Sequence, residues 1–394
     1  MYLTREEEKM LAGEMGHAVQ VAMEILVALG EIYGAEKMVP ITSAQVSGVS
    51  YKNLGEAGLE WLEDLSKDGR VRVQTTLNPA GIDLEKWREI GVSENFVEMQ
   101  KRVIDAYLAM GIKPTLTCTP YLAENMPRFA EHIAWSESSA VVYANSVIGA
   151  RTNREGGPSA LAAALTGRTP FYGLHLMENR VYSIKVISPN LEDEYDFALL
   201  GYVVGKQSKG RIPLFTGIRS ANQSELKALG AALGSISGTP MFHVEGITPE
   251  YTLTPEDRVE EIEVSDRDLE NASEELNDDV EPDLIFIGCP HASLEELIML
   301  IERLENRVVK KKMWVCTSRA VGALAKKLGV YQKLERLGVT ILSDTCPIVA
   351  PINELNIRSI ATNSVKGVWY SRNLNNLSIK LAKLSELVEE AVRD

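Results

Sequence analysis

Short segments rich in β-branched and apolar residues alternate with amphipathic helical segments along most of this chain. The strand-like runs include 71–77, 114–117, 284–288 and 339–342, and apolar residues between such runs recur with the helical period. This alternation predicts an α/β protein built from open sheets with helices on their faces. A length of 394 residues exceeds what one hydrophobic core usually organises, so we expect two or three α/β domains.

A densely acidic segment at 249–282 divides the alternating pattern. Charge runs of this kind usually form a solvated surface or a linker. We therefore predict an N-terminal α/β region at 1–248, an acidic connecting segment at 249–282 and a C-terminal α/β region at 283–394. Within these regions, residue spacing predicts one long helix over 5–33 and a capped helix over 294–304.

The composition excludes several classes of protein. Hydrophobic residues make up 45% and charged residues 24% of the chain, which is typical of a folded globular protein. A net charge of −14 argues against a nucleic-acid partner, because phosphate neutralisation requires clustered Lys and Arg. The sequence has no apolar run of membrane-spanning length, and its N-terminus lacks the apolar core of a signal peptide. We expect a cytoplasmic protein without membrane contact.

Three of the four cysteines share one local setting. Cys118 in PTLTCTPY, Cys289 in LIFIGCPH and Cys346 in ILSDTCPI follow apolar or β-branched runs and stand just before Pro or Thr–Pro. Each thiol is therefore expected at a strand end, where open α/β sheets collect ligands. Three thiols placed there could converge on one metal centre. Cys316 in MWVCTSRA lacks the proline and is least like the others.

Simple burial is the main alternative for each cysteine. A single cysteine is more often a small buried hydrophobe than a ligand, and four in so long a chain are too few for a disulfide framework. The paired CxxC spacing of structural zinc sites is absent from the sequence. Wide spacing across both predicted regions favours a cofactor held between domains.

Two polar segments are candidate ligand-binding loops. The segment 42–58, TSAQVSGVSYKNLGEAG, follows a predicted strand at 38–41 and is rich in Ser, Gly and Gln. Small residues there let backbone N–H groups approach a ligand. Ordinary turn chemistry is the competing interpretation for Gly48, and also for Asn78 and Pro79 in TTLNPAGID.

Eight segments of the chain together resemble a known family: ITSAQVSGVSYKNLGEAG, TTLNPAGID, TCTPYL, WSESSAVVYANSVIGARTNREGGPSAL, GCPHASLEEL, TSRAV, DTCPIV and TNSVKGVWY. The chain closely resembles the large subunit of aconitase X proteins, in particular the archaeal type, over nearly its whole length. The resemblance implies an aconitase-like α/β fold with multi-domain three-layer units and a cluster at the domain interface. It also implies a hydro-lyase of the mevalonate pathway in isoprenoid biosynthesis.

The resemblance implies a 4Fe–4S cluster held by Cys118, Cys289 and Cys346, with a fourth iron that has no protein ligand. Such an iron would act as a Lewis acid on the leaving hydroxyl group. Ordinary aconitases place two ligands in a CxxC pair, so a 2Fe–2S or three-iron form remains an alternative. The implied reaction converts (R)-mevalonate 5-phosphate to trans-anhydromevalonate 5-phosphate.

Substrate contacts are expected mainly in the loops. The positions that match the family's substrate motifs are Gly48, Val49, Ser50, Asn78 and Pro79. Glu137 and Ser138 lie at another predicted strand end, and Lys366 in TNSVKG would supply positive charge for a phosphate or carboxylate.

The resemblance also implies a partner chain. Aconitase-type folds close over the cluster with a mobile domain that supplies a serine base, whereas the last residues here, SELVEEAVRD, resemble a single amphipathic helix. We therefore expect a small subunit that completes a heterodimer. Rival interpretations are a cis-3-hydroxy-L-proline dehydratase, a non-catalytic iron–sulfur sensor or binding protein, and a cluster-free enzyme with a cysteine nucleophile. The sequence leaves open the roles of Cys316, His291, Arg151 and Arg154.

Overall fold

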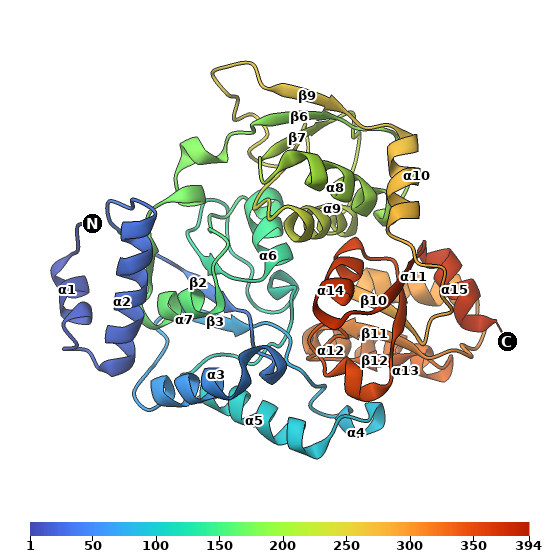
Figure 1. Ribbon diagram of the computed structural model, residues 1–394, viewed down its shortest axis with the longest axis horizontal. Helices are drawn as coiled ribbons and strands as arrows, with labels where there is room; N and C mark the ends of the chain where they lie inside the picture. The colour runs from blue at the N-terminus through green and yellow to red at the C-terminus, as the bar shows by residue number, and fades with distance from the viewer. Residues whose placement is uncertain (394) are drawn as a thin grey trace.

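Three parallel β-sheets, each covered by helices, organise the computed structural model, which describes residues 1–393 (Figure 1). Their strand orders are β3-β2-β4, β8-β7-β6-β9 and β12-β11-β10-β13-β14. A separate antiparallel pair joins β1 (Met38–Pro40) to β5 (Arg168–Pro170). The predicted α/β class is confirmed.

The first sheet consists of β2 (Ser43–Val46), β3 (Gln74–Leu77) and β4 (Ala134–Trp135). Its apolar side chains pack with those of α2, α3, α5 and α7 into one core. The helices of this unit are α1 (Arg5–Leu11), α2 (His17–Ile32), α3 (Tyr51–Ser66), α4 (Trp87–Ile90), α5 (Glu94–Ala109), α6 (Ser138–Tyr143) and α7 (Gly157–Thr166).

Two expectations about the first 60 residues are corrected here. The single helix predicted over 5–33 is two helices, because Gly13 and Gly16 between them adopt left-handed φ values of 78° and 102°. The segment 42–58, predicted as a loop, begins with strand β2 and runs into α3, so only its middle forms a loop. Ser, Gln and Ala at the strand positions hid the strand, because these residues have low β-propensity.

The second sheet consists of β6 (Ile184–Ile187), β7 (Pro213–Thr216), β8 (His243–Val244) and β9 (Glu260–Glu263). Its helices are α8 (Glu194–Ser208), α9 (Gln223–Ile236) and α10 (Asp266–Glu275). The acidic segment 249–282 contains β9, which pairs in parallel with β6, and the amphipathic helix α10. It therefore contributes to this sheet, and the domain limits at 248 and 282 stay a prediction.

The third sheet consists of β10 (Leu284–Ala292), β11 (Met313–Thr317), β12 (Thr340–Leu342), β13 (Ser359–Thr362) and β14 (Ser378–Leu381). Its helices are α11 (Leu294–Leu304), α12 (Arg319–Lys327), α13 (Val330–Arg336), α14 (Val365–Asn375) and α15 (Leu384–Val392). Short helical turns elsewhere are η1 (Pro120–Leu122), η2 (Ala144–Ile148), η3 (Gly173–His175), η4 (Met177–Arg180) and η5 (Ile352–Leu355). The helix predicted over 294–304 is confirmed as α11.

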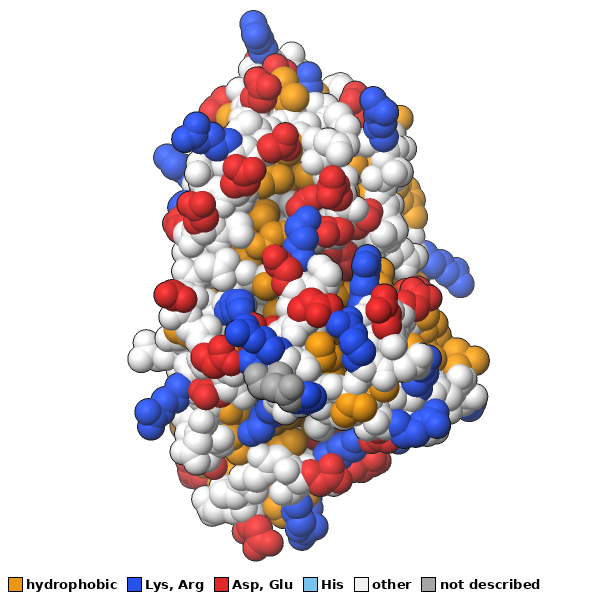
Figure 2. Space-filling model, turned by 90° about the vertical axis from the view of Figure 1, so that its right-hand side faces the viewer, with side chains coloured by type: hydrophobic (Ala, Val, Ile, Leu, Met, Phe, Trp, Pro, Cys, Tyr) orange, Lys and Arg blue, Asp and Glu red, His pale blue; other side chains and the backbone are white. Residues whose placement is uncertain are grey.

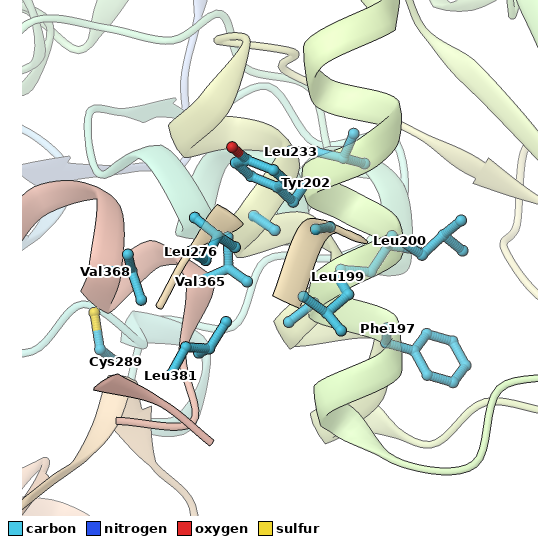
Figure 3. Packing of buried hydrophobic residues seen from close by; sticks show 14 of the residues in the cluster. Phe197, Leu199, Leu200, Tyr202, Leu233, Leu276, Cys289, Val365, Val368 and Leu381 are labelled. Atoms are coloured by element: carbon cyan, nitrogen blue, oxygen red, sulfur yellow. The ribbon is translucent and has the colours of Figure 1, made fainter. Parts of the chain in front are cut away.

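One core joins the second and third sheets. Strand β10 alternates its side chains between the faces of its sheet, so Phe286 packs into the core shared with α8 and α9, whereas Ile285 packs under α11 and α15. Figure 3 shows Leu199 of α8 on one side of this shared core and Val365 and Val368 of α14 on the other, with Cys289 at its margin. The two units therefore share one core that includes Cys289.

The face that carries α10 and α15 has interspersed acidic and basic side chains (Figure 2). Mixed charges of this kind are typical of a solvated surface. None of the helices formed by residues 1–393 is both long enough and apolar enough to cross a membrane.

Candidate active site

A cavity of about 320 Å³ lies between the first and third sheets and is lined by residues from both. The first unit contributes Ser47, Gly48, Asn53, Asn78, Pro79, Cys118, Ser136, Glu137, Ser138 and Arg154. The third unit contributes Gly288, Cys289, Cys346, Ile348, Val349, Lys366, Tyr370 and Leu374. Nine residues singled out from the sequence therefore meet in one cavity, three of them cysteines.

The cysteines reach the cavity from three different local structures. Cys346 stands in the turn that follows β12, as predicted, whereas Cys289 lies within β10 itself. Cys118 follows an irregular segment and not the strand predicted at 114–117, because Pro114 has no N–H to donate and Leu116 has a left-handed φ of 45°. All three thiols are more than nine-tenths buried.

Gly288 explains how β10 brings Cys289 so close to its neighbour β11. Its φ is 101°, and a Cβ atom at this position would lie only 2.1 Å from the carbonyl oxygen of Cys316. A side chain here would push the two strands apart. Cys316 is fully buried beneath this contact and lies outside the cavity lining, in agreement with its different sequence setting.

The cysteine thiols form a soft donor set. Burial raises the pKa of Cys118, Cys289 and Cys346 to about 12, although the nearby Lys366 ammonium acts in the opposite direction. A bound metal nevertheless displaces the proton from such a thiol, because the thiolate is the form that ligates metals. Within residues 1–393, no group of three or more His, Cys, Asp or Glu side chains is placed to hold a single metal ion. The three thiols line one cavity and lie close enough for the charge of one to raise the pKa of another, and thiols are the donor type that iron–sulfur groups take.

Glu137 and Lys366 form a buried ion pair on the cavity wall. Their side chains are 6% and 7% exposed, and the Lys366 ammonium also donates to Ser139 Oγ at 2.9 Å. Burial alone would raise the pKa of Glu137, but Lys366, Ser139 and the Ala140 N–H together hold it below its usual value. Burial likewise opposes the charge of Lys366, yet Glu137 and the thiols raise the pKa of that ammonium above its usual value. Both groups are therefore ionised at neutral pH.

Helix geometry positions this pair. Glu137 is the N-cap of α6 and accepts from the Ala140 N–H at 2.7 Å, which satisfies a free N–H group of the first turn. Lys366 lies in the first turn of α14, and Tyr370 follows one turn later on the same side, where its hydroxyl lies 3.3 Å from Ser138 Oγ. The pair thus links α6 of the first unit to α14 of the third.

The predicted substrate loops divide into two groups. Gly48, Asn78 and Pro79 line the cavity, and Asn78 Oδ1 accepts from the Gln45 amide at 3.2 Å. Val49 and Ser50 lie behind the wall: the Ser50 hydroxyl donates to the Val349 carbonyl at 2.8 Å, and Gln100 donates to the Val49 carbonyl at 3.0 Å. The Ser50 hydroxyl and the Val49 carbonyl therefore hold the loop in place, and neither residue lines the cavity.

Several lining residues were not predicted as site residues. Asn53, Ser136 and Tyr370 belong to this group. Arg154, whose role the sequence left open, also lines the cavity and donates to the Gly234 carbonyl at 2.9 Å. The i, i+4 spacing from Lys366 was a signal for Tyr370. Arg151 lies away from the cavity, next to Met177.

His291 is fully buried beside the cysteines but does not line the cavity. Burial lowers its pKa to about 4, so the imidazole is neutral at physiological pH.

A second cavity of about 400 Å³ lies between the N-terminal ends of α9 and α11. Within it, Lys227 forms an ion pair with Glu296, and Glu194 lies nearby, where the charge of Lys227 only partly offsets its burial. Burial, assisted by the charge of Glu296, raises the pKa of Glu194 to about 7. Between about pH 4.3 and about pH 7, Glu194 is therefore protonated in the folded protein but ionised in the unfolded chain.

The free energy of unfolding should consequently fall as pH rises from 5 to 8, by on the order of 1–2 kcal/mol through this carboxyl group. The Glu194→Gln variant is expected to lose that part of the decline, which denaturant titrations at several pH values would measure. Glu295→Gln, at an exposed position of the same cavity, should retain it. Equal pH profiles for wild type and Glu194→Gln would refute the assignment.

Comparison with known proteins shows which family the chain matches. Residues 1–178 match the description "Aconitase X first domain", residues 179–274 match "Aconitase X second domain", and residues 282–393 match "Aconitase X third domain". The crystal structure of Thermococcus kodakaraensis aconitase X in its holo form superimposes with a TM-score of 0.94. It is 48% identical, and the match covers 99% of this chain and 100% of that chain.

Curated relatives carry two names. A phosphomevalonate dehydratase large subunit from Methanothermobacter thermautotrophicus is 50% identical over 94% of this chain and 94% of that protein. One from Methanocaldococcus jannaschii is 45% identical over 99% of this chain and all of that protein. A cis-3-hydroxy-L-proline dehydratase from Pseudomonas aeruginosa is 36% identical over 98% of this chain but only 69% of that longer protein.

Proposed function

The chain belongs to the aconitase X family, and from this premise we propose that it is the large subunit of an iron–sulfur hydro-lyase that dehydrates (R)-mevalonate 5-phosphate to trans-anhydromevalonate 5-phosphate. The expected aconitase-like fold is confirmed by the match to the aconitase X structure. Relatives named phosphomevalonate dehydratase large subunit support a dehydratase subunit of the mevalonate pathway. The observation that carries the finer proposal is the meeting of three thiols and a buried Glu–Lys pair in one cavity.

Cys118, Cys289 and Cys346 would hold the cofactor, for which we propose a 4Fe–4S cluster with one iron free of protein ligands. When bound, the cluster would supply a Lewis acid that helps a tertiary hydroxyl leave and disperses negative charge on the adjacent carboxylate. The three thiols support this choice because thiolates are the usual ligands of iron–sulfur clusters.

The cavity suits a substrate with two anionic ends. Lys366 keeps its proton because Glu137 and the thiols raise its pKa, so it acts as a fixed cation. Arg154 supplies a second cation on the lining. Gly48, with a left-handed φ of 77°, lets the loop backbone come close to a ligand. Together these groups would orient the phosphate and carboxylate of mevalonate 5-phosphate.

The same charges disfavour cis-3-hydroxy-L-proline as the substrate. That molecule carries a cationic ring nitrogen and one carboxylate, and its nitrogen would need an unpaired acidic group. Glu137 is the carboxylate on the described lining, and Lys366 already neutralises it. With that pair neutral overall, Arg154 gives the charged groups of the described lining a net positive charge, which fits an anionic substrate better than a zwitterion.

The proton acceptor is proposed to come from a small subunit. On the described lining, Glu137 is tied to Lys366, Ser139 and its helix cap, while the three thiols are assigned to the cofactor. Neither Glu137 nor the three thiols are therefore free to remove a proton from carbon. Relatives that are named as large subunits support the idea that a separate partner chain takes part in the reaction.

Anaerobic reconstitution of the purified chain tests this assignment. With iron and sulfide, the chain alone should acquire the visible absorption of an iron–sulfur protein, but it should turn over mevalonate 5-phosphate only after the small subunit is added. Full turnover by the chain alone would refute the partner's role. Turnover by an iron-free complex would refute the cofactor.

A further inference from the structure

His291 contacts all three cysteine-bearing segments at once. Its main-chain N–H donates to Cys118 Sγ at 3.2 Å, and it stands two residues after Cys289. Its ring Nδ1 lies 2.9 Å from the Thr117 hydroxyl, next to Cys118, and its Nε2 lies 3.1 Å from the Thr345 carbonyl, next to Cys346.

The partners of the imidazole fix its tautomer. A carbonyl oxygen can only accept, so Nε2 carries the proton and donates to Thr345. In the neutral ring Nδ1 is then an acceptor, and the Thr117 hydroxyl donates to it. The Thr117 oxygen in turn accepts from the Thr119 N–H at 3.2 Å. Each ring nitrogen therefore has a directed partner on a different cysteine segment.

The main chain of His291 is anchored from the second sheet as well. The Lys227 ammonium of α9 lies 3.4 Å from the His291 carbonyl oxygen and forms a buried ion pair with Glu296. Glu296 itself accepts from the Ser293 N–H at 2.7 Å in the cap of α11. The contacts of His291 therefore reach all three matched domains: Thr117 in the first, Lys227 in the second and Thr345 in the third.

We propose that His291 is a positioning residue. It holds the segments of Cys118, Cys289 and Cys346 in fixed positions relative to one another, so that the three thiols face the cavity before any cofactor binds. Its importance for catalysis rests on the proposed function, whereas the preorganisation is a property of this chain alone. Buried directional hydrogen bonds suit this task, because a lost partner leaves polar groups on two other segments unsatisfied.

Thiol labelling of the cofactor-free chain tests the proposal directly. Alkylation rates of each cysteine, followed by peptide mass spectrometry, should rise at least about tenfold for Cys118 and Cys346 in His291→Ala, because local opening becomes easier. Cys316, which is buried against Gly288 and outside the cavity lining, should keep its rate and serves as the internal reference. His291→Asn and His291→Gln, which each retain one of the two ring contacts, should give intermediate rates.

His243→Ala is the matched control. His243 is also fully buried and has one ring contact at 2.8 Å, to the Arg180 carbonyl, away from the cysteines. It should leave the ratio of the Cys118 rate to the Cys316 rate unchanged. The proposal is overturned if all four thiols accelerate equally in the His291 variants, or if Cys118 and Cys346 do not accelerate at all.

A second readout addresses the cofactor. In protein reconstituted with iron and sulfide, release of iron to a chelator should be about tenfold faster for His291→Ala than for wild type. Failure of the wild-type chain to bind iron and sulfide would refute the proposed function and leave the labelling result valid. Equal release rates in a loaded wild type and a loaded His291→Ala would overturn the role of His291 toward the cofactor.

Discussion

Replacing Cys118, Cys289 or Cys346 with alanine should abolish cofactor retention and reduce turnover more than about a hundredfold, a larger loss than removal of an outer-shell partner causes. Each thiol lines the cavity from a separate segment, so the remaining two cannot replace the missing donor. The fold should survive, because removing one buried sulfur atom leaves only a small void.

Cys316→Ala is the matched control for this series. Cys316 is even more deeply buried than the other three but lies beneath Gly288, outside the cavity. Iron and sulfide per chain, together with the dehydration rate of the two-subunit complex, measure the outcome. Retention of full iron content and activity by Cys118→Ala would exclude that thiol as a ligand.

Substitution of Lys366 by methionine should cost both stability and activity. Loss of the ammonium leaves the Glu137 carboxylate buried without a counter-ion, which typically destabilises a fold by about 3–5 kcal/mol. The substrate also loses a fixed cation, and we expect turnover to fall at least about a hundredfold. Urea titration and steady-state rates would measure the two effects separately.

The double variant Glu137→Gln/Lys366→Met separates these effects. It removes both charges, so most of the lost stability should return while activity stays low. Recovery of activity together with stability would show that Lys366 has only a structural role. A stable and active Lys366→Met would contradict the account of the pair altogether.

Local signals in the sequence were sufficient to predict some of the helices. The helix over 294–304 was predicted with its observed bounds, because Ser293 and Glu296 form a capping box that marks its start. The predicted helix over 5–33 failed at two glycines whose left-handed conformations depend on the packing around them. Apolar periodicity alone does not report such a break.

The sequence was sufficient to predict those site residues whose own type or immediate neighbours indicate a role. The cysteine–proline settings singled out Cys118, Cys289 and Cys346, and Lys366 was singled out because it would supply positive charge. The partnership of Lys366 with Glu137 could not be predicted, because it joins residues 229 positions apart on two different helices. Burial of Ser50 behind the wall and exposure of Asn53 to the cavity likewise depend on how the units pack together.

The substrate of the reconstituted two-subunit complex is the most direct test of the central claim. Parallel incubations with (R)-mevalonate 5-phosphate and with cis-3-hydroxy-L-proline, followed by NMR for loss of water, would compare the two. The net positive charge of the described cavity lining predicts that the phosphorylated substrate alone is converted, to trans-anhydromevalonate 5-phosphate. Conversion of the hydroxyproline while mevalonate 5-phosphate stays intact would contradict the proposed function.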